Sequence, residues 1–154
     1  MIALDTNLLV YAHRSAVAEH RAARRAIVRA RASSAGWGFS LPVVGEFWSV
    51  VTHPTAAGRP SAPEEARRFV VALEAAGAEI WTPGGGFAAR LTQLAIELSV
   101  TGPRIFDLQI ALMAFEGGAT ELWTADRRFV SVPGLPVVSA FEAAVKPDED
   151  DDND

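Results

Sequence analysis

The stretch Met1-Ile2-Ala3-Leu4-Asp5-Thr6-Asn7 opens the chain with four apolar residues, followed by a carboxylate, a hydroxyl and an amide. A short apolar run of this kind predicts a buried strand. In a parallel sheet, the polar groups that follow the strands gather at the carboxyl edge, where such sheets bind ligands. The opening stretch therefore predicts a strand that presents Asp5 and Asn7 at a ligand-binding edge.

The composition is that of one globular domain, with 154 residues of which 49% are hydrophobic and 21% charged. No apolar run approaches the roughly 18 residues of a membrane span, and the N-terminus lacks the pattern of a secretory signal. We therefore expect a cytoplasmic protein with no membrane partner. Cysteine is absent, which excludes disulfides, thiolate metal ligands and cysteine nucleophiles.

The formal net charge of −5 combines a nearly neutral body with an acidic end. Six of the 19 acids lie in 148–154, which leaves 13 acids against 14 basic residues in the rest of the chain. We predict a domain at 1–146 and a disordered acidic tail at 147–154. One segment is rich in arginine, which suits either a solvated helix face or contact with RNA phosphates or an acidic protein segment. Its arginines are Arg14, Arg21, Arg24, Arg25, Arg29 and Arg31.

Apolar patterning predicts strands that alternate with one or two helices. After the opening strand, further strands are expected at about 37–41, 79–82, 121–124 and 136–139. Helices are expected at about 7–14, 17–33, 42–52, 63–76, 87–100, 107–116 and 141–145. This alternation indicates an α/β fold, a three-layer α/β/α sandwich with a short central parallel sheet. Apolar residues cover most of helix 42–52, so we expect that helix to be largely buried.

Four acids are expected near the carboxyl edge of this sheet. Asp5 and Asp126 follow strands directly, and Glu46 lies early in helix 42–52. Asp107 is expected to open a helix that runs away from the edge, and the next strand returns by a similar distance. We therefore expect Asp5, Glu46, Asp107 and Asp126 to converge on one rim.

Converging carboxylates repel one another, and some take up protons unless a positive charge compensates. Lys146 is the one lysine of the chain and is not available to neutralise them. A hard divalent cation with oxygen ligands, Mg²⁺ or Mn²⁺, would compensate the charge. Such an ion orients and acidifies a water for phosphodiester hydrolysis. The acids therefore predict metal-dependent nucleolysis.

A metal-free mechanism, with paired histidines as general acid and base, is an alternative. The chain has three histidines, at positions 13, 20 and 53. They fall on predicted helices that share no rim, so the sequence favours the metal-dependent reading.

The motifs around the acids resemble those of PIN-domain nucleases, and most closely those of the VapC toxins of bacterial toxin–antitoxin pairs. The motifs are Asp5-Thr6-Asn7 with Leu8-Leu9-Val10-Tyr11-Ala12 after it, Val43-Val44-Gly45-Glu46-Phe47, Asp107 before Ile110-Ala111, and Leu122-Trp123-Thr124-Ala125-Asp126-Arg127-Arg128-Phe129. The resemblance spans residues 1 to about 145. It implies a Mg²⁺-dependent endoribonuclease that is often a homodimer and is silenced by a VapB-type antitoxin bound near its active site.

The resemblance also implies roles for single residues, carried over by matching position. Metal ligands, or acids that support them, would be Asp5, Glu46, Asp107 and Asp126. Asn7 and Thr124 would orient carboxylates or water through hydrogen bonds.

Candidate contacts to the RNA backbone are Arg14, Arg127 and Arg128. The last two stand after Asp126, where some relatives hold another acid, and this leaves one-metal catalysis open. Residues 102–106, before Asp107, are bulkier and more basic than the usual approach to this acid.

Two other classes of protein place acids in a similar way. A phosphoacceptor receiver or an Asp-nucleophile phosphatase needs a lysine near the site, and the phosphatase needs a second Asp at position 7, where this chain has Asn7. A non-catalytic PIN-like module that only binds RNA or protein would have no use for four mutually repelling acids.

Overall fold

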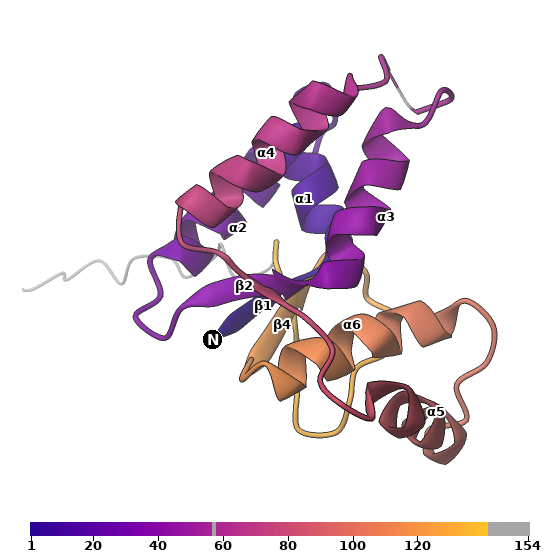
Figure 1. Ribbon diagram of the computed structural model, residues 1–154. Helices are drawn as coiled ribbons and strands as arrows, with labels where there is room; N and C mark the ends of the chain where they lie inside the picture. Colours follow the sequence, from indigo (N-terminus) through magenta and orange to yellow (C-terminus); the bar gives the residue numbers. More distant parts are fainter. Residues whose placement is uncertain (57, 142–154) are drawn as a thin grey trace, which may run out of the picture.

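The computed structural model describes residues 1–56 and 58–141 (Figure 1). Within them, one parallel sheet has the strand order β3-β2-β1-β4-β5. The strands are β1 (Ile2–Leu4), β2 (Trp37–Ser40), β3 (Glu79–Trp81), β4 (Glu121–Thr124) and β5 (Val137–Ser139). The prediction of an α/β fold with a short central parallel sheet is confirmed.

Helices cover both faces of this sheet. In Figure 1, α1 (Thr6–His13) and α2 (His20–Arg31) lie above it, with α3 (Leu41–Thr52) and α4 (Pro63–Ala75) packed beside them. Below it lie α5 (Phe87–Glu97) and α6 (Arg104–Glu116). No helix in the described part of the chain has the length and apolar character needed to cross a bilayer. The elements thus form the three layers that the sequence predicts.

The opening strand β1 occupies the centre of the sheet. It pairs with β2 on one side and with β4 on the other, and Leu4 lies opposite Trp123 of β4. Immediately after this pair, the backbone N–H of Asp5 donates to the carbonyl of Trp123 at 3.0 Å. The central pairing therefore brings Asp5 level with the end of β4, although more than a hundred residues separate the two in the sequence.

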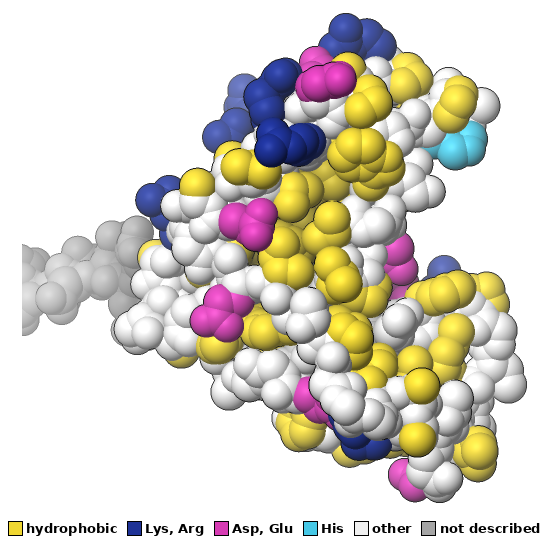
Figure 2. Space-filling view, viewed as in Figure 1, with side chains coloured by type: hydrophobic (Ala, Val, Ile, Leu, Met, Phe, Trp, Pro, Cys, Tyr) yellow, Lys and Arg dark blue, Asp and Glu magenta, His cyan; other side chains and the backbone are white. Residues whose placement is uncertain are grey.

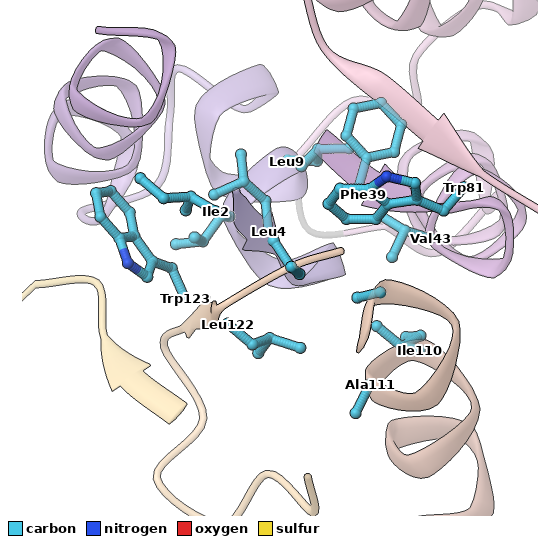
Figure 3. Close-up of a cluster of buried hydrophobic side chains, with 14 of the residues drawn as sticks. Ile2, Leu4, Leu9, Phe39, Val43, Trp81, Ile110, Ala111, Leu122 and Trp123 are labelled. Atoms are coloured by element: carbon cyan, nitrogen blue, oxygen red, sulfur yellow. The ribbon is translucent and has the colours of Figure 1, made fainter. Parts of the chain in front are cut away.

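A continuous hydrophobic core on both sides of the sheet holds this centre in place (Figure 3). Leu4, Phe39 and Leu122 come from neighbouring strands and are completely buried. Leu9 of α1 and Ile110 of α6 are buried members of the same core. Burying each such side chain contributes about 1.5–3 kcal/mol to the stability of the fold. The carboxyl edge of the sheet, which carries the polar residues, therefore adjoins a well-packed core.

Two predictions about helices are wrong in detail. Helix α3 is amphipathic rather than largely buried: Val43, Phe47 and Val51 face the core, whereas Trp48 and Val50 are exposed. Helix α6 begins at Arg104, so Asp107 lies at the end of its first turn instead of opening the helix. Its N-cap is Pro103, which already has helical backbone angles. The predicted acidic tail at 147–154 lies outside the described residues, as does all but the first residue of the predicted helix at 141–145.

His13 is the last residue of α1, in the upper layer. Its ring packs edge-on against Phe47 and Phe69, with centroid distances of 5.3 and 5.0 Å, and Nε2 lies 2.8 Å from the hydroxyl of Ser61. Burial, and secondly the charge of Arg14, lowers the pKa of His13 below its usual value. Burial therefore favours the neutral ring.

We predict that Gly38→Ala destabilises the fold by about 1–3 kcal/mol, because a Cβ at this position of β2 would overlap the backbone carbonyl of Glu79 on β3. Gly45→Ala is the matched control, because nothing lies within 4 Å of a Cβ there and the residue is in a helix. The control should stabilise the protein by about 0.5–1 kcal/mol. Urea denaturation of the three proteins measures both changes, and equal stability of the two variants would contradict this packing.

We predict that His13 lowers the stability of the folded protein as the pH falls below about 6.5, the ordinary pKa of histidine. The folded state holds the pKa of His13 below that of the unfolded chain, so the unfolded state takes up the proton first. In thermal unfolding between pH 8 and pH 5, His13→Gln should therefore gain stability relative to the wild type as the pH falls. His53→Gln is the control, since His53 is hydrogen-bonded to exposed Thr55, and this variant should follow the wild type. Parallel pH curves for His13→Gln and the wild type would refute the assignment.

Candidate active site

Asp5 is the most buried of the four acids. It ends β1 and serves as the N-cap of α1, where the N–H of Thr6 donates to its Oδ1 at 2.7 Å. A carboxylate at a helix N-cap satisfies an otherwise unpaired backbone donor and interacts favourably with the helix dipole. Asp5 is only 6% exposed, so these contacts hold a charged group inside the protein.

The other oxygen of Asp5 is held by two polar side chains. Oδ2 accepts hydrogen bonds from the hydroxyl of Thr124 at 2.6 Å and from Nδ2 of Asn7 at 3.0 Å. Asn7 Nδ2 also lies 2.9 Å from the Thr124 oxygen, and Asn7 Oδ1 accepts from the N–H of Ala125 at 3.2 Å. The amide therefore ties α1 to the end of β4 and fixes the Asp5 carboxylate between them.

The pKa of Asp5 is raised to about 6, mainly by burial and to a smaller degree by the charges of Asp107 and Glu46. The hydrogen bonds from Thr124 and from the Thr6 N–H act in the opposite direction. Desolvation therefore outweighs the mutual repulsion that the sequence emphasises. No arginine, lysine or histidine of the described residues forms an ion pair with Asp5, so its charge is supported by neutral donors alone.

Glu46 reaches the same edge from α3 and is half-buried there. The hydroxyl of Thr6 donates to its Oε2 at 2.7 Å. Thr6 therefore donates to both carboxylates, to Asp5 through its backbone N–H and to Glu46 through its hydroxyl. Thr6 has no predicted role, since nothing in the sequence shows a contact across forty residues.

Asp107 and Asp126 form the more exposed side of the site, and Arg104 lies between them. Nη1 of Arg104 donates to Asp107 Oδ2 at 2.9 Å and lies 3.6 Å from Asp126 Oδ2. Each acid has one further anchor, the N–H of Val130 for Asp107 and the N–H of Arg128 for Asp126. The prediction that the four acids lack a basic counter-ion, which rests on the single lysine of the chain, is wrong: an arginine from the first turn of α6 pairs with two of them.

Hydrogen bonds and this ion pair connect the four predicted acids. Thr6 connects Asp5 with Glu46, Arg104 connects Asp107 with Asp126, and the Thr124 oxygen accepts from the N–H of Asp126 at 3.0 Å while it donates to Asp5. In residues 1–56 and 58–141, no three acidic or histidine side chains approach closely enough to ligate one ion as they stand. The donor chemistry nevertheless fits Mg²⁺ or Mn²⁺, because all four groups are carboxylates and buried Asp5 has no basic partner among the described side chains.

The arginines proposed for the RNA backbone occupy two different places. Arg127 and Arg128 are exposed beside Asp126, and Arg127 lines a cavity of about 430 Å³ together with Thr124, Asp126 and Phe129. Arg14 lies at the opposite end of α1, where its guanidinium donates to the carbonyls of Val51 and Arg59. The structure thus brings two of the three arginines to the acids.

Basic side chains also cover the upper helices. Arg21, Arg24 and Arg25 of α2 are exposed, while three of its alanines, at 23, 26 and 30, are buried. Figure 2 shows further basic side chains gathered over α4, which carries the exposed Arg67 and Arg68. Part of the predicted basic segment is therefore a solvent-facing surface that α4 extends, whereas Arg29 packs over Trp123 and donates to the Ala140 carbonyl.

The three histidines do not form a catalytic pair. His13 contacts Ser61 and two phenylalanines, the Nδ1 of His20 lies 3.0 Å from the Tyr11 carbonyl, and His53 accepts from the N–H of Thr55. No histidine touches any of the four acids through a hydrogen bond or ion pair in the described residues. The geometry therefore gives no support to a metal-free mechanism with paired histidines.

The sequence matches known proteins over most of its length. The PIN domain family model matches residues 2–135. Ribonuclease VapC43 of Mycobacterium tuberculosis and a VapC ribonuclease of Mycobacterium bovis are each 35% identical to this chain over 130 residues. The matched region covers 84% of this chain and 88% of each relative.

Solved structures share the fold at lower sequence identity. VapC20 of M. tuberculosis, described as a toxin that cleaves the sarcin-ricin loop, matches with a TM-score of 0.64 and 14% identity over 86% of this chain and 98% of its own. A chain of VapBC2 from Rickettsia felis, solved with a DNA fragment from its promoter, matches with a TM-score of 0.62 and 22% identity over 90% and 98%. These matches confirm the resemblance that the four acidic motifs indicate. The chain is a PIN-domain protein and belongs to the VapC ribonuclease family.

Proposed function

We propose that this VapC-family ribonuclease is a Mg²⁺- or Mn²⁺-dependent endoribonuclease, and that Asp5, Glu46, Asp107 and Asp126 hold the metal. One observation carries the proposal: Asp5 is buried, has a raised pKa, and is held by three neutral donors with no basic partner among the described residues. A carboxylate in such a place is costly unless a cation compensates its charge.

The two oxygens of Asp5 accept different numbers of hydrogen bonds. Oδ2 accepts from both Thr124 and Asn7, whereas Oδ1 accepts only from the Thr6 N–H in the described structure. Oδ1 therefore keeps acceptor capacity for a cation. Thr6 likewise holds Oε2 of Glu46 and fixes the direction of that carboxylate.

When bound, a divalent cation would supply the positive charge that acidifies a water and neutralises charge developing on the phosphodiester. The chain itself would place the RNA. Arg127 and Arg128 are exposed next to Asp126, where they can attract backbone phosphates through charge. Hydrolysis of this kind splits a P–O bond with water and makes no use of the 2′-hydroxyl.

We further propose that the protein acts in the cytoplasm as the toxin of a toxin–antitoxin pair, with a VapB-type antitoxin as its partner and a homodimer as its active form. The relatives named VapC, and the VapBC2 complex among the similar structures, support the antitoxin. The description of VapC20 as a toxin that cleaves the sarcin-ricin loop supports a structured RNA as substrate.

We predict that Asp5→Asn and Glu46→Gln each abolish cleavage, with losses of at least about a hundredfold, because each removes a charge from the metal-binding edge. Glu97→Gln is the control, since Glu97 is an exposed acid of α5 that pairs with Gln93 away from the site. Cleavage of a structured RNA in Mg²⁺ or Mn²⁺ measures the effect, with circular dichroism to confirm the fold. Full activity of both site variants would refute the catalytic assignment. RNA binding without cleavage by the wild type would favour the non-catalytic module.

We also predict that Mg²⁺ raises the melting temperature of the wild type but not that of Asp5→Asn. A ligand that binds only the folded state stabilises it by mass action, and the variant lacks the buried ligand. Each protein is compared with its own melting temperature in EDTA, because the amide of the variant cannot accept all the hydrogen bonds that the Asp5 carboxylate accepts. Differential scanning fluorimetry with and without MgCl₂ tests this, with matched NaCl to remove general salt effects. Equal Mg²⁺-dependent shifts in both proteins would place the metal elsewhere.

A further inference from the structure

Arg104 is the one basic side chain of the described residues that forms an ion pair within the acidic site. It is the first residue of α6, and its Nη1 touches Asp107 at 2.9 Å and approaches Asp126 at 3.6 Å. The two acids come from different elements, a helix and the segment after β4. One guanidinium therefore spans the gap between the two acids on the exposed side of the site.

We propose that Arg104 is a displaceable counter-cation that competes with the divalent metal for Asp107 and Asp126. This inference rests on the proposed function, because it concerns the same site. Binding of the metal to these two acids displaces the guanidinium, so Arg104 lowers the metal affinity of the protein.

The geometry makes the two cations exclusive on this side. Mg²⁺ binds carboxylate oxygens at about 2.0–2.1 Å and requires a complete octahedral shell. The guanidinium uses Oδ2 of Asp107 and also approaches Oδ2 of Asp126. A dication at these oxygens would lie within a few ångströms of a guanidinium that carries a full positive charge at neutral pH. Repulsion between them must then weaken binding unless the arginine moves.

Arg104 is able to move, while the acids have reasons to stay. Its side chain is 38% exposed, and its contact with Asp126 exceeds hydrogen-bond length. Exposed pairs of this type contribute little to stability and are readily exchanged for water. The backbone N–H groups of Val130 and Arg128 continue to hold Asp107 and Asp126 when the guanidinium leaves.

Another arginine of the chain shows what a purely structural pair looks like. Arg90 of α5 binds Glu116 at the end of α6 through two nitrogens, at 2.5 and 2.9 Å, and also donates to the carbonyl of Gly85. This pair fastens α5 to α6 and touches none of the four acids. Arg90→Gln is thus a matched control that removes an arginine–carboxylate pair outside the site.

The test is a titration of the full-length protein with MnCl₂, in which electron paramagnetic resonance measures free Mn²⁺. Arg104→Gln should bind Mn²⁺ roughly tenfold more tightly than the wild type, because it removes both the competitor and the repulsive charge. Arg104→Lys keeps a positive charge and should stay near the wild-type affinity. Arg90→Gln should leave the affinity unchanged. Thermal unfolding in EDTA establishes that every variant is folded before titration.

The outcomes separate this inference from the proposed function. If the wild type binds Mn²⁺ and Asp5→Asn does not, but Arg104→Gln binds no more tightly than the wild type, then Arg104 is no competitor and the inference is wrong while the metal site stands. Weaker binding by Arg104→Gln would show instead that the arginine organises the acids for the metal. If the wild type does not bind Mn²⁺, or Asp5→Asn binds it equally well, the proposed metal site fails and the inference fails with it.

Discussion

The hydrogen bond from Thr124 to Asp5 is the constraint on which the candidate site depends. A buried carboxylate is costly without donors, and this one receives its closest donor from a residue 119 positions away. The bond forms only because β1 and β4 are parallel neighbours and end at the same level, with Leu4 opposite Trp123. The hydrogen bond therefore requires this register of β1 and β4, since a slip by one residue would turn the Thr124 side chain to the other face of the sheet.

The short strands follow from the same arrangement. β1 is completely buried between its neighbours, so a few apolar residues suffice, and the chain changes to a helix as soon as Asp5 is reached. Asp5 then caps α1, and this cap orients Thr6 toward Glu46 of α3. Asp5 and Thr6 thus follow the strand, begin α1 and contact α3 within two residues. Loops of several residues at this point would leave the carboxylates free to turn away from each other.

Much of this could be predicted from the sequence, and what could not depends on contacts between distant residues. The alternation of apolar runs predicted the parallel sheet, and acids placed after strands or early in helices predicted the four carboxylates of the candidate site. The start of α6 could not be placed correctly, because Pro103 is compatible with the turn before a helix as well as with a break. The spacing of Arg104 and Asp107 is visible as a helical i,i+3 pair once that start is known, but the approach to Asp126 depends on where β4 ends. The contact of Thr6 with Glu46 left no sequence signal at all.

The site has two halves that differ in how they support negative charge. Around Asp5 the support comes from buried neutral dipoles, which cannot leave and which rigidly fix the oxygens. Around Asp107 and Asp126 it comes from a partly exposed cation that water and ions can replace. Neutral dipoles compensate only part of the cost of burying a charge, as the raised pKa of Asp5 demonstrates. Under the proposed function, a metal ion would be attracted most strongly to the buried half, and on the exposed half it would have to replace the guanidinium of Arg104.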